Sequence, residues 1–243
     1  KELIALNQDP LYQQAYVVAK NSGCYILARD IKKLNGTQRA FAIYNPNDTA
    51  QRVQVSFSDL CLAGKVSLRD LFLKKDLGQF SGTYTVTVPA HGTRIYKAQG
   101  ERRLERTRYE AETAYISDYQ ELTNNQAAKT GIYEYADYCS SGLKAGWLGQ
   151  SESNDLQWRD VYSHKGGKYE LTIAYISGEN RTMAVDVNGQ RVQTISVSSG
   201  SCNTVAKKTV SIQLKKGRNT IRLSNATGWM PDIDYIDVRP VFQ

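Results

Sequence analysis

The sequence is constrained most by a two-residue periodicity, in which apolar side chains occupy every second position of short segments. Residues 169–175 and 210–214 follow this pattern, and residues 84–88 alternate tyrosine or valine with threonine. Such alternation indicates β-strands with one buried and one exposed face. Further strand-like segments are 25–28, 39–44, 53–57 and 233–238. Turn residues separate these segments and helical patterns are nearly absent between them, so we predict an all-β chain of antiparallel β-sandwiches.

The length of the chain and one charged stretch indicate two domains. A chain of 243 residues can form two domains of ordinary size. The stretch from Glu101 to Arg108 mixes basic and acidic residues and has the composition of a solvated linker. We therefore expect four consecutive segments: a helical segment at 1–14, a first β-domain at 15–98, a linker at 99–107 and a second β-domain at 108–243.

The formal net charge of +7 raises the question of a nucleic-acid partner. The basic residues, however, occur singly or in pairs beside expected turns, as at Lys32-Lys33 and Lys215-Lys216. No nucleic-acid recognition motif accompanies them. No apolar run approaches the roughly 20 residues that a membrane-spanning helix requires. We expect neither nucleic-acid binding nor a membrane span.

The four cysteines are Cys24, Cys61, Cys139 and Cys202, and none belongs to a C-x-x-C pair. A zinc ribbon or a thioredoxin-like site is therefore not expected. Two cysteines fall in each domain, so an oxidising compartment would permit the pairs Cys24/Cys61 and Cys139/Cys202. The second pair is the better candidate because both cysteines lie in loops rich in serine and glycine. Free thiols are the alternative.

Two glutamates, and not the histidines, are the residues that suggest chemistry. His91 and His164 lie in turn-like segments with no neighbouring nucleophile and acid. In an extended segment Glu110 and Glu112 would point to the same face, about 7 Å apart, and carboxylates this close repel each other unless a positive charge intervenes. The spacing leaves three alternatives: a calcium site, a glycosidase acid/base pair, or two exposed glutamates on an edge strand.

Several motifs are distributed along the second domain: Tyr109–Glu112, Gly146–Gly149, Gly166–Leu171, Asn188-Gly189 and Ile233–Ile236. Together they resemble the carbohydrate-binding modules of families 35 and 6, and the resemblance covers the whole of this domain. It implies a jelly-roll β-sandwich of the galactose-binding type.

In that family the two opening glutamates and the closing aspartate bind a structural calcium ion. Carried over by position, the ligands would be Glu110, Glu112 and Asp234, with backbone carbonyls completing the coordination shell. The apolar segment around Asp234 agrees with this assignment, because a buried acid requires a partner.

Sugar binding in such modules often uses loops at one end of the sandwich, with an aromatic ring beneath the sugar and amides on its hydroxyls. Residues 224–229 form the matching loop, so Asn225 and Trp229 are the main carbohydrate-binding candidates. Tyr138 and Asn203, in the two cysteine-bearing loops, are secondary candidates. In the alternative interpretation, Trp229 packs in the core and Asn225 only turns the chain.

The first domain carries its own set of short motifs, at residues 4–11, 69–78 and 88–92. In sequence and order they resemble family 27 glycoside hydrolases, chiefly α-galactosidases. Residues 4–11 resemble the stretch that closes the catalytic barrel of that family, and residues 69–78 and 88–92 resemble the β-domain that follows the barrel. Residues 1–14 would then be a remnant of the last barrel helix, ended near Pro10 because the residue before a proline disfavours helical geometry. Tyr12 departs from the family pattern, which usually has glycine there.

This second resemblance implies that the chain itself has no catalytic residue. The two catalytic aspartates of family 27 lie on barrel strands upstream of the matched part. The chain would be the non-catalytic carboxy-terminal region of an extracellular or periplasmic α-galactosidase-like enzyme. Its partners would be the missing amino-terminal barrel and a polysaccharide containing galactose or uronic acid. The alternatives are a free-standing lectin or adhesin and a purely structural calcium-binding domain.

Overall fold

The computed structural model describes residues 1–11, 13–33, 36–123 and 126–241. It divides the chain into two compact units, Lys1–Glu105 and Arg106–Gln243. Antiparallel strands dominate both units, so the all-β prediction is confirmed. Tyr12 lies outside the described residues. Across the described ranges, no helix has both the length and the apolar character needed to span a membrane.

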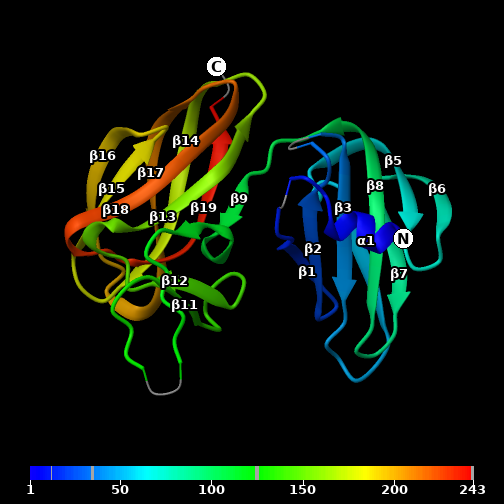
Figure 1. The fold of residues 1–243 in the computed structure, drawn as a ribbon, viewed down its shortest axis with the longest axis horizontal. Coiled ribbons are helices and arrows are strands. Elements are labelled where there is room, and N and C mark those ends of the chain that lie inside the picture. Colours follow the sequence, from blue (N-terminus) through cyan, green and yellow to red (C-terminus); the bar gives the residue numbers. More distant parts are fainter. Residues whose placement is uncertain (12, 34–35, 124–125, 242–243) are drawn as a thin grey trace. The chain divides into compact units, whose positions relative to one another are not determined.

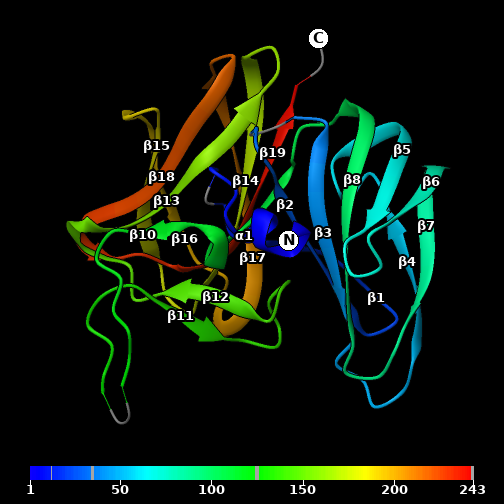
Figure 2. The same ribbon diagram turned by 45° about the vertical axis from the view of Figure 1, so that its right-hand side comes forward.

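The first unit is a two-layer β-sandwich (Figure 1). Its described elements are α1 (Glu2–Asn7), β1 (Tyr16–Asn21), β2 (Cys24–Asp30), β3 (Gln38–Tyr44), β4 (Gln51–Ser56), β5 (Leu62–Asp70), β6 (Lys75–Ser81), β7 (Thr83–Val88) and β8 (Thr93–Arg103). Six strands form one sheet in the order β1-β2-β3-β8-β5-β6, and β4 pairs with β7. Phe41, Val55 and Tyr96 belong to the core between these layers. Helix α1 lies beside the larger sheet, where Glu2 binds Arg69 of β5 at 2.7 Å (Figure 2).

One boundary in the first unit agrees with the prediction and one differs. The helix within residues 1–14 ends at Asn7, shortly before Pro10, as expected. The linker expected at 99–107 begins later, because residues 99–103 complete β8 and pair with β5. Arg103 is 8% exposed and donates hydrogen bonds to the carbonyls of Leu60 and Cys61. The mixed charges of this stretch predicted a solvated linker, but the basic side chain of Arg103 is buried inside the domain.

The second unit is a larger β-sandwich. Its described elements are β9 (Arg108–Glu110), the 3₁₀-helix η1 (Ala111–Thr113), β10 (Tyr115–Ile116), β11 (Ile132–Tyr135), β12 (Leu143–Gly146), β13 (Gly149–Ser163), β14 (Gly167–Ser177), β15 (Arg181–Val187), β16 (Gln190–Val197), β17 (Ser201–Leu214), β18 (Gly217–Trp229) and β19 (Asp232–Pro240). One sheet has the order β10-β13-β18-β15-β16. The other has the order β11-β12-β19-β14-β17, with β9 added beside β19.

The alternating strands of the second unit place their apolar residues in one core, as the periodicity predicts. Leu171, Ile212 and Leu223 are all at most 1% exposed and belong to it. The predicted hairpin is confirmed: β15 pairs with β16, and Asn188 and Gly189 connect them with φ values of 52° and 80°.

The extended geometry expected through Glu112 is wrong. Strand β9 ends at Glu110, and the chain then turns through η1. The turn is tightened because the Thr113 hydroxyl donates to the Glu110 carbonyl at 2.8 Å. All four cysteines lie within the described ranges and are free thiols; Cys202 is exposed and the other three are buried.

Candidate functional site

Three carboxylates of the second unit converge although they are far apart in the sequence. We call Glu110, Glu112 and Asp234 the acidic cluster. Strand β9 pairs with β19 so that Glu110 lies opposite Tyr235, the neighbour of Asp234. Glu110 is 7% exposed and Asp234 is 1% exposed. The sheet pairing therefore brings two acids into the protein interior side by side, and η1 adds the third.

The acidic cluster meets one loop residue, Ser140. The hydroxyl of Ser140 lies 2.6 Å from Glu110 Oε2 and 3.0 Å from Asp234 Oδ1. Its backbone N–H donates to Asp234 Oδ1 at 3.0 Å. A hydroxyl has a single proton to donate, so it cannot satisfy two ionised carboxylates at once. Asp234 therefore relies on the backbone N–H of Ser140 when the hydroxyl donates to Glu110, and a proton or a cation would stabilise the pair of carboxylates further.

The pKa values of the acidic cluster express the same imbalance. Burial and, to a lesser extent, the charges of Glu112 and Asp234 raise the pKa of Glu110 to about 7, against the opposing effect of the Ser140 hydrogen bond. Burial also raises the pKa of Glu112 and of Asp234. Glu112 Oε2 and the Ser141 hydroxyl oxygen are buried without a hydrogen-bond partner of acceptable geometry. The cluster thus contains more buried carboxylate oxygen atoms than the neighbouring hydrogen-bond donors can satisfy.

Calcium is the ion that suits these ligands chemically. It binds oxygen only, mixing carboxylates with backbone carbonyls in shells of 6–8 ligands. In the parts of the chain that the structure describes, no three His, Cys, Asp or Glu side chains lie close enough, as they stand, to share one ion. The cluster thus offers oxygen donors of the type that calcium binds, among them the buried Glu112 oxygen, but not in a geometry that already surrounds an ion.

A pair of tryptophans forms a second feature of this unit. Trp147, in the turn between β12 and β13, packs edge-on against Trp229 at the end of β18, with ring centroids 5.6 Å apart. Trp147 is 42% exposed, whereas Trp229 is half-buried. Large aromatic rings that remain exposed on a rigid frame are typical of ligand contacts. We call these two residues the tryptophan pair.

The turn that carries Trp147 is held in an unusual conformation. Trp147 has a φ of 58°, which a bulky residue rarely adopts. Asn154, 1% exposed, donates to the carbonyls of Trp147 and Gly149 at 2.7 and 2.8 Å. At Gly149 a Cβ atom would lie 2.3 Å from the Gly228 carbonyl oxygen, so only glycine allows this close approach to the end of β18. The exposed ring is therefore fixed in place.

The structure separates the sugar-binding candidates taken from the sequence. Trp229 lies in the tryptophan pair, but Asn225 shapes a turn: its Nδ2 donates to the Thr182 carbonyl at 2.9 Å, and its Oδ1 accepts from two backbone N–H groups. Tyr138 donates its hydroxyl to the Cys202 carbonyl at 3.1 Å. Asn203, the next residue, is exposed.

Sequence reasoning missed two residues of these sites. Trp147 was recognised only as part of a motif, although a tryptophan between glycines, in a turn that offers no strand face to bury it, is itself a signal of exposure. Ser140 carries no such signal, because nothing in a Ser/Gly-rich loop distinguishes the serine that contacts two distant acids.

The comparison with protein families identifies the second unit. The model for the carbohydrate binding module, family 35, matches residues 107–241. The chain belongs to this family. The model for the α-galactosidase C-terminal β-sandwich domain matches residues 31–98. The two domain resemblances inferred from the sequence are thereby confirmed, and both matched parts are non-catalytic accessory domains.

Solved structures show similarity to one or both units. A family 35 module from Clostridium thermocellum is 26% identical with a TM-score of 0.48, and the match covers 55% of this chain and 98% of that one. The isomalto-dextranase of Arthrobacter globiformis T6, complexed with panose, is 22% identical with a TM-score of 0.54, over 98% of this chain and 41% of that one. α-Galactosidase I from Mortierella vinacea is 24% identical with a TM-score of 0.39, over 42% and 27%.

This chain therefore spans less than half the length of either enzyme. No curated protein sequence matches it. The tryptophan pair and the acidic cluster both lie within residues 107–241, the part that matches the family 35 model.

Proposed function

We propose that this chain is the carboxy-terminal accessory region of an α-galactosidase-like glycoside hydrolase, which it tethers to polysaccharide. In this proposal the family 35 module binds carbohydrate through the tryptophan pair, and the acidic cluster holds a structural calcium ion. The enzyme would act outside the cytoplasm, where polysaccharide is found. Tethering raises the local concentration of substrate beside the catalytic domain.

The exposed face of Trp147 is the single observation that carries the carbohydrate-binding proposal. A fixed aromatic plane suits the apolar C–H face of a sugar ring, and little ordering is required on binding. Charges close to the pair are already balanced: Lys144 binds Asp232 at 2.5 Å and Glu134 at 3.4 Å. Arg181, which donates to the Met230 carbonyl next to Trp229, is likewise paired, with Glu179 at 2.8 Å. With both cations paired to acids, this end of the sandwich favours neutral sugars over uronic acids.

The unsatisfied acids of the cluster support the calcium proposal. Glu110, Glu112 and Asp234 would supply the carboxylate ligands. Calcium would neutralise their charge and join β9, η1 and β19 at one point. The rival proposal, catalysis by Glu110 and Glu112, is disfavoured because Glu110 is buried and bonded to Ser140. It requires glycoside hydrolysis that survives the removal of calcium.

The parent enzyme has a second candidate identity. The similarity to the isomalto-dextranase extends over both units of this chain, whereas that to the α-galactosidase covers 42% of it. Dextran therefore joins galactose-containing polysaccharide among the glycans to be tested.

The test is a glycan-array profile of the whole chain, recorded with calcium and again with a chelator. We expect binding to one class of neutral glycan, lost when Trp147 or Trp229 is replaced by alanine. Tyr135→Ala is the matched control, because this tyrosine is 82% exposed and lies outside the tryptophan pair. Binding that survives both tryptophan substitutions would remove the proposed site. No binding under either condition would leave a structural module and contradict the tethering role.

A further inference from the structure

The outer face of the sheet β10-β13-β18-β15-β16 contains a hollow of about 220 Å³. Its floor is formed by Ala184 and Ser224, which are 5% and 1% exposed. Their neighbours Val185 and Leu223 belong to the core, so the floor residues face the opposite side of the sheet. The volume lies below the roughly 300–1,000 Å³ of sites for drug-sized ligands. It suits one small ring.

The rim of the hollow is polar and belongs to four strands: Glu152, Thr182, Arg191, Thr194, Asn225 and Thr227. None of the described residues that line the hollow is aromatic. Asn225, a sugar-binding candidate from the sequence, shapes this rim through the turn that it stabilises. The rim therefore offers hydroxyl, carboxylate and guanidinium groups around a floor of small side chains.

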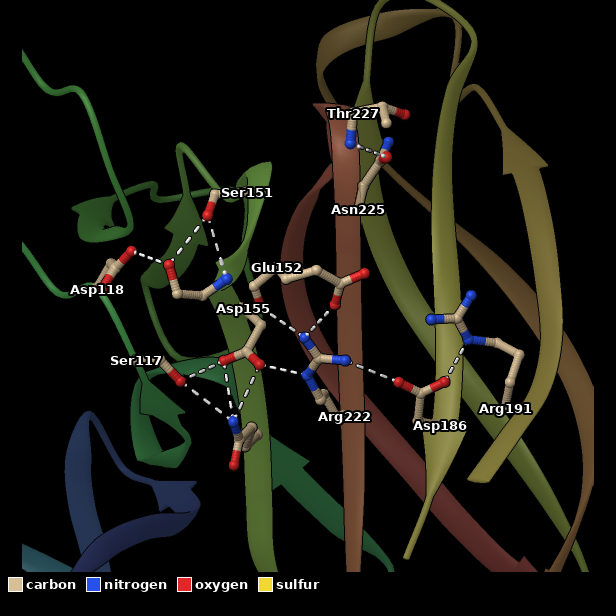
Figure 3. Close-up of polar contacts among 12 residues, drawn as sticks. Ser117, Asp118, Ser151, Glu152, Asp155, Asp186, Arg191, Arg222, Asn225 and Thr227 are labelled. Carbon is tan, nitrogen blue, oxygen red and sulfur yellow. Dashed lines mark hydrogen bonds and ion pairs between the residues drawn. The ribbon is translucent and has the colours of Figure 1, made fainter. Parts of the chain in front are cut away.

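A chain of ion pairs fixes the charged part of this rim (Figure 3). Arg222, in the middle of the sheet, binds Glu152 Oε2 and Asp186 Oδ2, each at 2.9 Å, and also binds Asp155. On the far side of Asp186, its other carboxylate oxygen binds Arg191. Glu152 and Arg191 are thus held on opposite sides of the hollow before any ligand arrives, which lowers the entropic cost of binding.

Glu152 and Arg191 each retain capacity for a ligand. Figure 3 shows the second carboxylate oxygen of Glu152 pointing away from Arg222, and two guanidinium nitrogens of Arg191 pointing away from Asp186. Their side chains are 64% and 48% exposed. A carboxylate accepts hydrogen bonds from hydroxyl groups, and a guanidinium donates to them. Glu152 as acceptor and Arg191 as donor therefore match a ligand with several neighbouring hydroxyl groups.

The charge of this network excludes an acidic ligand. The carboxylates of Glu152, Asp155 and Asp186 outnumber the guanidinium groups of Arg191 and Arg222, which leaves a net charge of about −1. Arg191 is already paired with Asp186. We propose that the hollow is a second carbohydrate subsite, separate from the tryptophan pair, which takes one neutral pyranose unit. This inference rests on the proposed function only for the ligand class.

The test is a two-dimensional NMR titration of the whole chain with isotope-labelled backbone amides. The probes are galactosyl-mannotriose, isomaltotriose and the acidic trigalacturonate. We expect at least one neutral probe to shift the amide signals of Ala184, Thr194 and Ser224 saturably, and trigalacturonate to leave them unchanged. Arg191→Ala and Glu152→Gln should each weaken this binding about fivefold, as expected for one lost hydrogen bond. Arg218→Ala is the control, because Arg218 forms an exposed ion pair with Asp160 on the same sheet.

The indole signals of Trp147 and Trp229 report on the tryptophan pair in the same titration. Shifts at the indoles without shifts at the hollow would overturn this inference and leave the proposed function intact. Shifts at the hollow alone would support the subsite and contradict the proposed role of the tryptophans. Shifts at the hollow with trigalacturonate, or at neither place, would overturn the subsite. Unaltered amide spectra of the free variants outside the substituted position show that each variant is folded.

Discussion

Two buried carboxylate clusters of this protein, one in each unit, are neutralised in different ways. In the first unit, Asp30 is 2% exposed and lies against two guanidinium groups, at 3.1 Å from Arg39 and 3.2 Å from Arg103. In the second unit, Glu110 and Asp234 are equally deep but meet the hydroxyl and amide of Ser140. The first cluster is in direct contact with two arginines, whereas the cations nearest the second, Arg106, Arg108 and Lys207, lower the pKa values of its acids by less than burial raises them.

This difference determines what each cluster responds to. Burying a charge is costly unless it is paired. The cations that pair with Asp30 are side chains of the protein itself, Arg39 and Arg103, so the stability of this cluster should be insensitive to added ions. Arg106, Arg108 and Lys207 offset the charge of the acidic cluster only in part. Further neutralisation must come from protons or from a cation in solution, so the stability of the cluster should depend on pH and on calcium. The following predictions test this contrast, from the largest expected effect to the smallest.

The first prediction concerns Arg39, whose side chain is fully buried. Arg39→Ala leaves Asp30 with one guanidinium partner in place of two and removes the hydrogen bonds to Tyr16 and the Leu60 carbonyl. Breaking a buried pair typically costs about 3–5 kcal/mol, and we expect a loss of this size from the unfolding free energy of the first unit. Thiol labelling of Cys24, 0% exposed, along a urea gradient measures it.

The control for Arg39 is Arg69→Ala in the same unit. Arg69 also pairs with two acids, Glu2 and Asp76, but its side chain is 31% exposed. Exposed pairs contribute only about 0–1 kcal/mol. Equal losses for the two variants would contradict the contrast between buried and solvated pairing.

The second prediction concerns pH and the metal-free acidic cluster. The pKa of Glu110 is raised from 4.5 to about 7 in the folded state. Between these values the folded protein holds a proton that the unfolded chain has lost, so stability falls as pH rises from about 4.5 to about 7. The total loss is up to about 3 kcal/mol, at about 1.4 kcal/mol for each unit of pKa.

Tryptophan fluorescence measures this loss in the second unit alone, because Trp147, Trp158 and Trp229 are the only tryptophans of the sequence. The titration is run in chelator. Glu110→Gln should flatten the pH dependence, since its amide does not ionise, while Glu101→Gln in the first unit should leave it unchanged. A stability that rises over this pH range would refute the assignment of Glu110.

The third prediction is that calcium stabilises only the second unit. At a free concentration 100-fold above its dissociation constant, a ligand adds about 2.7 kcal/mol to the unfolding free energy. We expect this gain above pH 7, where the carboxylates are ionised, and a smaller one near pH 5. Asp234→Asn should abolish it. Calcium that also slowed labelling of Cys24 would show that its effect is not confined to the acidic cluster.

These contrasts show where sequence reasoning succeeds. Strands, the hairpin at Asn188 and the three acids are predictable because periodicity, turn chemistry and motif order are local properties of the chain. Arg103 was expected in a solvated linker because its neighbours are charged; its burial depends on the pairing of β8 with β5. Likewise, the hydrogen-bond partner of Glu110 and Asp234 is Ser140, which tertiary structure alone brings to them.

The tryptophans illustrate the same limit. Trp229 could be proposed from its loop, but the exposed partner ring is Trp147, whose position depends on Asn154 and on the close approach at Gly149. The hollow on the sheet face is still harder to foresee, because its floor consists of unremarkable small residues. Sites that depend on the close approach of two backbone segments, or on small side chains, have almost no recognisable pattern in the sequence.

The last prediction asks whether binding is independent of both buried clusters. Trp147→Ala removes an exposed ring, so the unfolding free energies of both units and the calcium effect should stay within about 0.5 kcal/mol of the parent values. Glycan affinity should fall at least about tenfold, as for a binding hot spot, measured by isothermal titration calorimetry in calcium. Tyr135→Ala, the exposed aromatic control, should leave affinity unchanged. If Trp147→Ala instead weakened calcium binding, the tryptophan pair and the acidic cluster would act as one site, and the acids would serve recognition as well as stability.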